Sequence, residues 1–167
     1  KSLRIVTMER EPRILTLQGR DIGKAAHAYG TNGIITELEI GLAESREWTD
    51  VIVSFLDFNQ SLYFTQALAN SNSINTKEIA IFEAPITNYF PDFSIPASEH
   101  SCFAMVQSSD LDHMRKLIVQ SCGTLVYEKS NPEKGKQRPL YEFTWNHTTL
   151  HAINRDPGIT YLQSLFL

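Results

Sequence analysis

The stretch Trp48-Thr-Asp-Val-Ile-Val-Ser-Phe-Leu-Asp-Phe-Asn-Gln-Ser-Leu-Tyr-Phe-Thr-Gln-Ala-Leu68 decides the fold, because it passes from a strand pattern to a helix pattern within a few residues. Residues 48–55 are mostly β-branched and apolar, as in a buried strand. Asp57 is a suitable N-cap for a helix whose apolar side is expected to hold Phe58, Leu62, Phe64 or Thr65, and Leu68. The stretch therefore predicts one βα unit.

The same order of elements recurs further along the chain. After a Ser- and Asn-rich loop we expect a second strand, a proline-containing irregular segment, a third strand, a second helix and a fourth strand. These segments span residues 78–83, 84–100, 102–107, 109–121 and 124–128. Two successive βαβ units predict an α+β fold of the ferredoxin-like split βαβ type, with two helices on one face of a four-stranded sheet.

The first forty residues predict a smaller arrangement. Residues 3–8 and 13–18 alternate as two strands of a hairpin, because proline and charge mark a turn between them. Asp21 is expected to start a short helix over residues 22–29, which Gly30 ends. A half-buried strand is then expected over residues 34–41, where apolar and acidic side chains alternate.

A polar run, Ala43-Glu-Ser-Arg-Glu47, marks the expected domain boundary. The predicted units are residues 1–43 and 44–167. Within the second unit, residues 130–139 predict an exposed loop, and the aromatic residues 140–154 predict a partly helical segment. A strand pattern that begins directly after Lys1, together with an apolar C-terminus, predicts that the chain is a piece of a longer protein.

Composition excludes several classes of protein. The 167 residues are 42% hydrophobic and 20% charged, which is typical of a globular domain. A net charge of -4 disfavours nucleic-acid binding, because no basic field attracts phosphates. No apolar run is long enough for a membrane span. Cys102 and Cys122 predict two buried free thiols and a cytoplasmic location, with a single bridge between them as the alternative.

Two glycines three residues apart, in Ala28-Tyr-Gly-Thr-Asn-Gly-Ile-Ile-Thr-Glu-Leu-Glu-Ile40, give the main functional signal. Gly30 and Gly33 carry no side chain, so an anionic cofactor could approach the main-chain N–H groups closely. The structural alternative is a helix end followed by a tight turn. Spacing alone favours this alternative, because short glycine motifs discriminate weakly.

The longer segment His27-Ala-Tyr-Gly-Thr-Asn-Gly-Ile-Ile-Thr-Glu-Leu-Glu-Ile-Gly-Leu42 resembles the end of the FAD-binding domain in the vanillyl-alcohol oxidase and p-cresol methylhydroxylase superfamily of flavoproteins. Those proteins carry Gly-(Ser/Thr)-x-Gly-(Ile/Val)-(Ile/Val)-Thr at this place. Within the superfamily the sequence is most similar to FAD/FMN-containing dehydrogenases of the glycolate and D-lactate dehydrogenase group. Tyr141-Glu-Phe-Thr-Trp-Asn-His-Thr-Thr-Leu-His151 also resembles the substrate domain of that group.

The resemblance implies that residues 30–36 lie along FAD. The cofactor-binding residues carried over are Gly30, Thr31, Asn32, Gly33, Ile34, Ile35 and Thr36. It further implies oxidation of a 2-hydroxy acid or another alcohol by hydride transfer to flavin, and a second domain containing a ferredoxin-like sheet. The family's principal pyrophosphate-binding loop comes earlier than this segment. We therefore expect the chain to need the remainder of the FAD domain as a partner and to bind FAD poorly alone.

The aromatic segment near the C-terminus supplies the candidate substrate and catalytic residues. His147 is a candidate proton acceptor, with Tyr141 beside it, and Trp145 and Asn146 are candidate substrate-binding residues. The alternative, favoured by the usual role of aromatics, is packing between domains with a satisfied histidine. His147 and His151 have helical spacing but lack a third ligand, so no metal site is predicted.

A second function class is left open by the sequence. Ferredoxin-like domains also occur as non-catalytic ligand-sensing or dimerisation modules, and fold alone does not exclude this use. In that case residues 44–128 would form an autonomous homodimer, and the glycine pair would be a turn.

Overall fold

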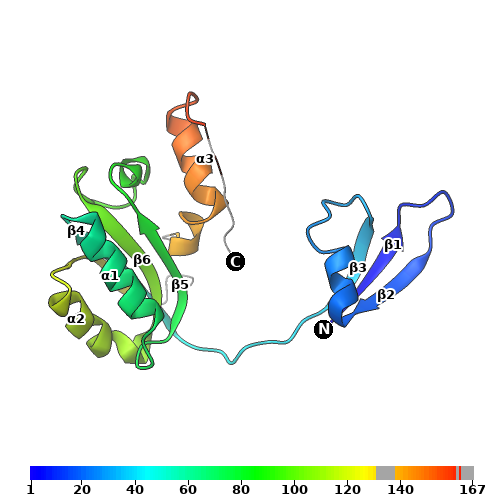
Figure 1. Ribbon diagram of the computed structural model, residues 1–167, viewed down its shortest axis with the longest axis horizontal. Helices are drawn as coiled ribbons and strands as arrows, with labels where there is room; N and C mark the ends of the chain where they lie inside the picture. Colours follow the sequence, from blue (N-terminus) through cyan, green and yellow to red (C-terminus); the bar gives the residue numbers. More distant parts are fainter. Residues whose placement is uncertain (131–137, 161, 163–167) are drawn as a thin grey trace. The chain divides into compact units, whose positions relative to one another are not determined.

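The computed structural model describes residues 1–130, 138–160 and 162 (Figure 1). The chain divides into two compact units, Lys1–Ser45 and Arg46–Leu167, close to the boundary expected after residue 43. Two antiparallel sheets and a few helices make this a mixed α+β protein, as predicted. Most of the loop expected over residues 130–139 lies outside the described residues.

The first unit is a three-stranded antiparallel sheet in the order β2-β1-β3. β1 (Ser2–Thr7) and β2 (Ile14–Gln18) form the expected hairpin, and β3 (Gly33–Glu39) pairs with the other side of β1. Leu3 and Ile5 of β1 are buried. The buried core of this unit is small, as expected for a sheet of three short strands.

The prediction of a helix over residues 22–29 is wrong. A 3-10 helix, η1 (Gly19–Lys24), occupies part of the segment, and turns lead from it to β3. Asp21 does not cap it, because Gln18 holds the N-cap position and the Asp21 carboxylate lies 2.6 Å from the Nζ atom of Lys24. No residue of η1 is buried, so no packed apolar face stabilises a longer helix.

The second unit is built on a four-stranded antiparallel sheet in the order β5-β6-β4-β7. The strands are β4 (Trp48–Phe55), β5 (Thr76–Phe82), β6 (His100–Gln107) and β7 (Thr124–Ser130). They lie where the sequence predicts them, with ends that shift by one or two residues at most.

Two helices join these strands and cover one face of the sheet. α1 (Phe58–Ala69) connects β4 to β5, and α2 (Leu111–Gln120) follows the short η3 (Ser108–Asp110) and precedes β7. Asp57 caps α1 as predicted, because its Oδ1 atom accepts a hydrogen bond from the Gln60 backbone N–H at 3.1 Å. In Figure 1 both helices lie side by side over the sheet.

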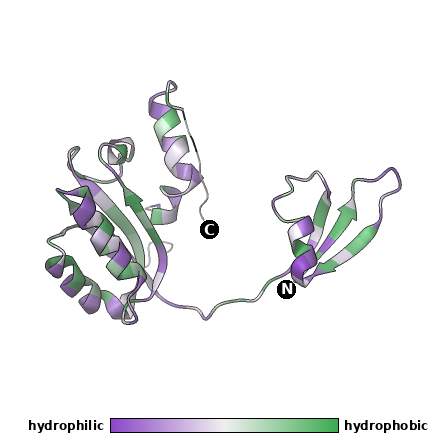
Figure 2. Ribbon diagram, viewed as in Figure 1, coloured by the Kyte–Doolittle hydropathy of each residue, from purple (hydrophilic) through white to green (hydrophobic). Residues whose placement is uncertain are grey.

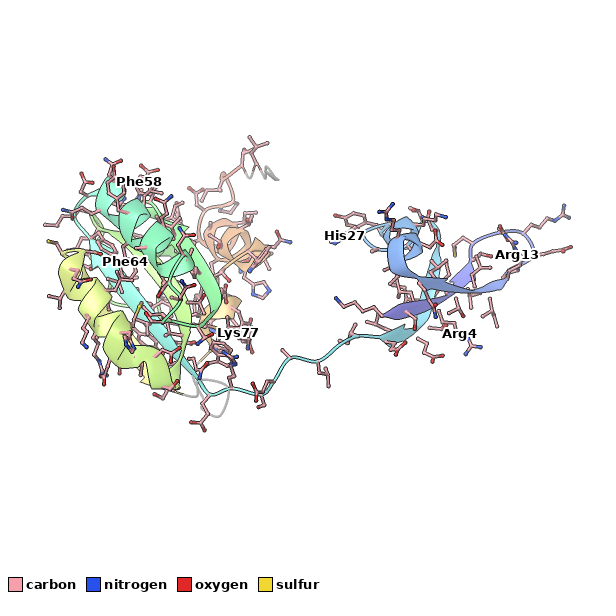
Figure 3. The ribbon with its side chains drawn as sticks, turned by 60° about the horizontal axis from the view of Figure 1, so that its bottom comes forward. Arg4, Arg13, His27, Phe58, Phe64 and Lys77 are labelled. Carbon is pink, nitrogen blue, oxygen red and sulfur yellow. The ribbon has the colours of Figure 1, made fainter. Side chains whose placement is uncertain are left out.

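Side chains of the central strands alternate between two cores, as strand geometry requires. One set faces the helices, where Phe64 of α1 points inward (Figure 3). In Figure 2 hydrophobic colour follows the strands, whereas α2 alternates between hydrophilic and hydrophobic residues. The buried members of this core are Val51, Val53, Phe55, Phe64, Leu68, Ile74, Cys102, Ala104, Val106, Met114 and Ile118.

The opposite face of the sheet is covered by irregular and short helical segments. They include η2 (Ile86–Tyr89) and η5 (Leu140–Glu142), and α3 (Asn146–Arg155) packs against both of them. These elements bear out the expected irregular and partly helical regions. Aromatic rings of the strands and of the segments that cover them are in contact, with ring centroids 4.8 to 5.7 Å apart. The rings belong to Phe82, Phe90, Phe93, Phe103 and Phe143.

The cysteines are only partly as predicted. Both thiols are free, so the alternative of a bridge is wrong, and Cys122 is exposed although a buried thiol was expected. Cys122 follows the last turn of α2, has a positive φ of 54° and is exposed at the surface. None of the helices in the described part of the chain has the length and apolar character that a membrane span requires.

Candidate functional site

The glycine loop of the first unit is held by short-range contacts. The hydroxyl of Thr31 donates to the carbonyl of Ala28 at 2.6 Å, and the side-chain amide of Asn32 donates to the carbonyl of Lys24. Gly30 has a φ of 77°, a conformation that glycine adopts without strain. The loop therefore has a defined backbone path, even though the expected helix does not lead into it.

The two glycines are required for different reasons. A Cβ on Gly33 would lie 2.5 Å from the carbonyl oxygen of Val6, so this glycine lets β3 pack on β1. A Cβ on Gly30 would meet no atom within 4 Å. The space at Gly30 is open to a ligand, whereas the absence of a side chain at Gly33 is explained by the sheet itself.

β3 is more exposed than the sequence predicts. Ile34 is 63% exposed and Ile35 is 51% exposed, so the expectation of a half-buried strand is wrong. The reason is that no buried side chain packs over β3, since Leu3, Ile5 and Thr7 of β1 are the buried residues of this unit. β3 is also an edge strand, so one of its edges is unpaired within the described residues of the unit. Thr36 is the bulged residue between the pairs Arg4–Glu37 and Ile5–Ile35, and its hydroxyl donates to the Arg4 carbonyl at 3.3 Å.

These features are compatible with an anionic cofactor along residues 30–36. The space at Gly30 is open, and η1 carries the basic residues Arg20 and Lys24, of which Lys24 is paired with Asp21. Positive φ angles at His27 and Tyr29 add backbone strain immediately before Gly30. Strain of this kind concentrates at ligand-binding sites. Residues of this unit could therefore hold part of FAD.

The second unit carries a pocket on the edge strand β5. Its volume is about 570 Å³, and it is lined by Lys77, Glu78, Ile79, Tyr141 and Trp145. The first three residues come from β5, whereas Tyr141 comes from η5 and Trp145 immediately precedes α3. The structure thus brings two of the predicted site residues together and adds a charged pair.

Each of the two charged residues that line this pocket makes a contact with a residue of the segment 141–145. The hydroxyl of Thr144 donates to the Oε1 atom of Glu78, and the Nζ atom of Lys77 lies 5.6 Å from the centroid of the Tyr141 ring. Figure 3 labels Lys77 where it projects from β5. Sequence reasoning missed Lys77 and Glu78. The only signal for them was a pair of charged residues at the start of an otherwise apolar strand.

His147 and Asn146 do not line this pocket. Asn146 begins α3, and His147 lies in its first turn with its backbone N–H donating to the Thr144 carbonyl at 3.0 Å. The His147 Nδ1 atom is 3.6 Å from the Oε2 atom of Glu142, a residue that the sequence did not single out. Nδ1 is buried and makes no hydrogen bond to a described residue, so Glu142 is near His147 without being bonded to it.

The remaining histidine of α3 has a packing role. His151 stacks on Phe143 with a centroid distance of 4.9 Å, and its Nε2 atom lies 3.0 Å from the Glu142 carbonyl oxygen. Phe143 is itself fully buried in the core of its own unit. Over the residues with described positions, no group of three potential metal ligands is present.

Two polar residues, Asp50 and Tyr127, lie on the face of the sheet that η5 covers. Neither was among the predicted site residues. Asp50 is fully buried, and its Oδ2 atom accepts a hydrogen bond from the Leu140 backbone N–H at 2.9 Å. Burial raises the pKa of Tyr127, and the nearby carboxylates of Asp50 and Asp92 raise it further. Tyr127 therefore stays a neutral phenol well into the alkaline range.

Comparisons with known proteins add no family assignment. No protein-family model matches the chain, and no curated protein matches it.

Proposed function

We propose that the chain is part of an FAD-dependent oxidoreductase related to the vanillyl-alcohol oxidase and p-cresol methylhydroxylase superfamily, oxidising a 2-hydroxy acid or another alcohol by hydride transfer to flavin. The observation that carries the proposal is the segment 30–36. Its sequence resembles the family motif, and Gly30 combines a positive φ with open space beside an exposed strand edge. Residues 30–36 would hold part of the cofactor through their main chain.

The topology of the second unit supports its assignment as a ferredoxin-like substrate domain. The strand order β5-β6-β4-β7, with one helix after β4 and one after β6, is the order that a split βαβ arrangement requires. Both helices pack on the same face. We assign substrate binding to this unit because it carries the pocket that includes Tyr141 and Trp145.

His147 would remove the hydroxyl proton of a substrate that extends past Trp145 toward the start of α3, because the His147 side chain does not line the pocket itself. The Glu142 Oε2 atom lies 3.6 Å from Nδ1, beyond hydrogen-bond range, and a tautomer with its hydrogen on Nδ1 leaves Nε2 as the proton acceptor. As the hydroxyl oxygen loses its proton and the carbon loses a hydride, the C–O single bond becomes a carbonyl. The product of a 2-hydroxy acid is thus a 2-oxo acid.

The visible spectrum of the purified full-length parent protein tests the proposal. A flavin absorption band in the blue region is the expected result. A folded parent protein without flavin would contradict the proposal and favour the ligand-sensing or dimerisation module.

A matched pair of variants tests the cofactor loop. In the full-length parent protein, Gly30→Asn adds a side chain at a positive φ that asparagine tolerates. The added side chain should exclude the cofactor from residues 30–36, so we expect the variant to contain less flavin. Gly41→Asn is the control, since a side chain there also meets open space but lies outside residues 30–36. Equal flavin content in the two variants would argue against cofactor binding at Gly30.

A further inference from the structure

We propose that His100 is a pH-sensitive switch, in which protonation of the imidazole ring separates the two ends of the segment 84–99. This segment leaves the sheet at Ala84, just after β5, and returns to it at His100, the first residue of β6. The Nδ1 atom of His100 accepts a hydrogen bond from the Ala84 backbone N–H at 3.1 Å. One side chain therefore joins both ends of the segment, and its change of charge is independent of the proposed function.

The direction of this hydrogen bond fixes the protonation state of His100. A backbone N–H group only donates, so Nδ1 must be the unprotonated ring nitrogen, and the hydrogen of the neutral ring is on Nε2. A protonated imidazole carries hydrogens on both nitrogens and has no acceptor left. The bond to Ala84 therefore exists only while His100 is neutral, and it is lost as the pH falls through the titration of the ring.

The hydrogen bond extends the pairing of β5 with β6. Phe82 and Ser101 form the last backbone pair of the two strands, and the contact between Ala84 and His100 lies directly beyond that pair. Without it, the Ala84 N–H must find water as its acceptor. Loss of the bond should therefore free the chain from residue 84 onward while the ladder up to Phe82 stays paired.

The ring of His100 also has a partner that accepts a cation. Its centroid lies 5.3 Å from the centroid of Phe58, the first residue of α1, which Figure 3 labels. The face of an aromatic ring attracts a positive charge at this distance. The protonated side chain of His100 can thus keep its contact with α1 when it loses the contact with Ala84.

The charged residues next to these contacts are all acidic. Asp57 precedes Phe58 as the N-cap of α1, Glu83 lies between β5 and Ala84, and Glu99 directly precedes His100. On β4 the residue paired with His100 is the apolar Phe55. α1 and β6 contain no other charged residue. Since His100 is also partly exposed, a proton can reach the ring and is not opposed there by a basic side chain.

The middle of the segment is held by contacts in which His100 takes no part. The ring of Phe90 packs against Phe82 and Phe103 of the sheet, with centroids 5.3 and 5.7 Å away. The Asp92 carboxylate pairs with Arg138 at 2.9 Å. These contacts should keep the sheet covered at low pH, so the change is confined to the ends of the segment.

NMR of the 167-residue chain tests the proposal, because imidazole changes charge between about pH 5 and 8. At pH 8 the ¹⁵N shifts of the His100 ring should show the hydrogen on Nε2. Between pH 8 and pH 5 the shift of the Ala84 amide hydrogen should follow the titration of that ring. The protection of the Ala84 amide against hydrogen exchange, relative to its intrinsic rate at each pH, should fall about tenfold.

An amide in the middle of β6 distinguishes this local change from unfolding. Phe103 should keep its protection over the same pH range, because β6 is paired on both sides with β5 and β4. A pH-independent Ala84 amide, or an equal loss of protection at Phe103, would overturn the proposal.

A matched pair of histidine variants completes the test. His100→Asn places an oxygen acceptor near the position of Nδ1 that does not titrate, so the protection of Ala84 should no longer depend on pH. His113→Asn removes an exposed histidine of α2 and should leave the pH dependence intact. The same pH dependence in both variants would also overturn the proposal. If His100→Asn does not fold, the titration of the unmodified chain decides between the outcomes alone.

Discussion

The two glycines in the loop of the first unit are required for different physical reasons. Gly33 is required by close packing of β3 on β1, whereas Gly30 is required by its backbone conformation and borders open space. The sequence motif predicts both glycines as ligand-binding residues. Spacing cannot distinguish the two causes, because the close contact of Gly33 is with Val6, a residue distant in the chain.

Gly33→Ala should destabilise the first unit. The new Cβ would lie 2.5 Å from the Val6 carbonyl oxygen, so the backbone must shift at a cost of about 1–3 kcal/mol. Hydrogen exchange of the β1 and β3 amides in the intact chain measures the effect. Gly41→Ala meets open space and serves as the control. Equal exchange rates in both variants would show that the contact does not constrain the sheet.

The two cysteines should differ strongly in reactivity. Burial raises the pKa of Cys102 to about 12, so its thiol stays protonated, whereas Cys122 is exposed. A disulfide exchange reagent should therefore label one thiol in the native protein and two in urea, and Cys122→Ser should abolish native labelling. Rapid native labelling of Cys122→Ser would contradict the burial of Cys102.

The same pKa shift predicts the direction of a pH effect on stability. Because the folded state raises the pKa of Cys102 above its ordinary value of 9.0, the stabilisation by the neutral thiol is complete below pH 9.0. It is lost progressively as the pH rises toward about 12. Cys102→Ala should therefore show a smaller loss of stability over this alkaline range in urea unfolding.

His147 and Glu142 should affect turnover to different extents if the proposed function holds. Removing the proton acceptor in His147→Gln should lower kcat of the parent enzyme by about 10²–10⁴-fold. Glu142→Gln removes only a nearby carboxylate, 3.6 Å from Nδ1, and should have a smaller effect. An unchanged kcat in His147→Gln, with flavin bound, would assign the proton transfer to another group.

At the scale of elements, the sequence predicts the second unit well because its signals are local and mutually consistent. β4 has the predicted bounds, and Asp57 caps α1 as expected. The first unit is harder, since η1 has no buried residue and its expected helix depended on one polar residue and one glycine. The exposure of β3 depends on what packs over the sheet, which periodicity does not encode.

The hydrogen bond between Asp50 and the Leu140 N–H should hold η5 against the sheet. Asp50→Ala removes the acceptor, which is fully buried, and leaves the N–H without this partner, at a cost of about 1–3 kcal/mol. Urea unfolding measures the loss. Asp112→Ala, on the exposed side of α2, is the control. A similar midpoint for both variants would mean that the apolar packing of Leu140 and Phe143 holds η5 without this hydrogen bond.

At the scale of the whole molecule, the candidate site is assembled from segments that are distant in sequence. Tyr141 and Trp145 were predicted from the aromatic segment, but Lys77 and Glu78 come from β5, more than sixty residues earlier. Their proximity follows from the position of β5 at the sheet edge and of η5 and α3 on one face. A linear pattern carries no information on this tertiary arrangement.

The central claim is that the parent protein oxidises an alcohol with bound flavin. Anaerobic addition of 3-phenyllactate or smaller 2-hydroxy acids to the purified parent protein, followed by visible absorption, tests it most directly. We expect the oxidised-flavin band to disappear as one equivalent of the 2-oxo acid forms per flavin. A flavin band that neither a 2-hydroxy acid nor another alcohol bleaches, or a folded parent without flavin, would contradict the claim.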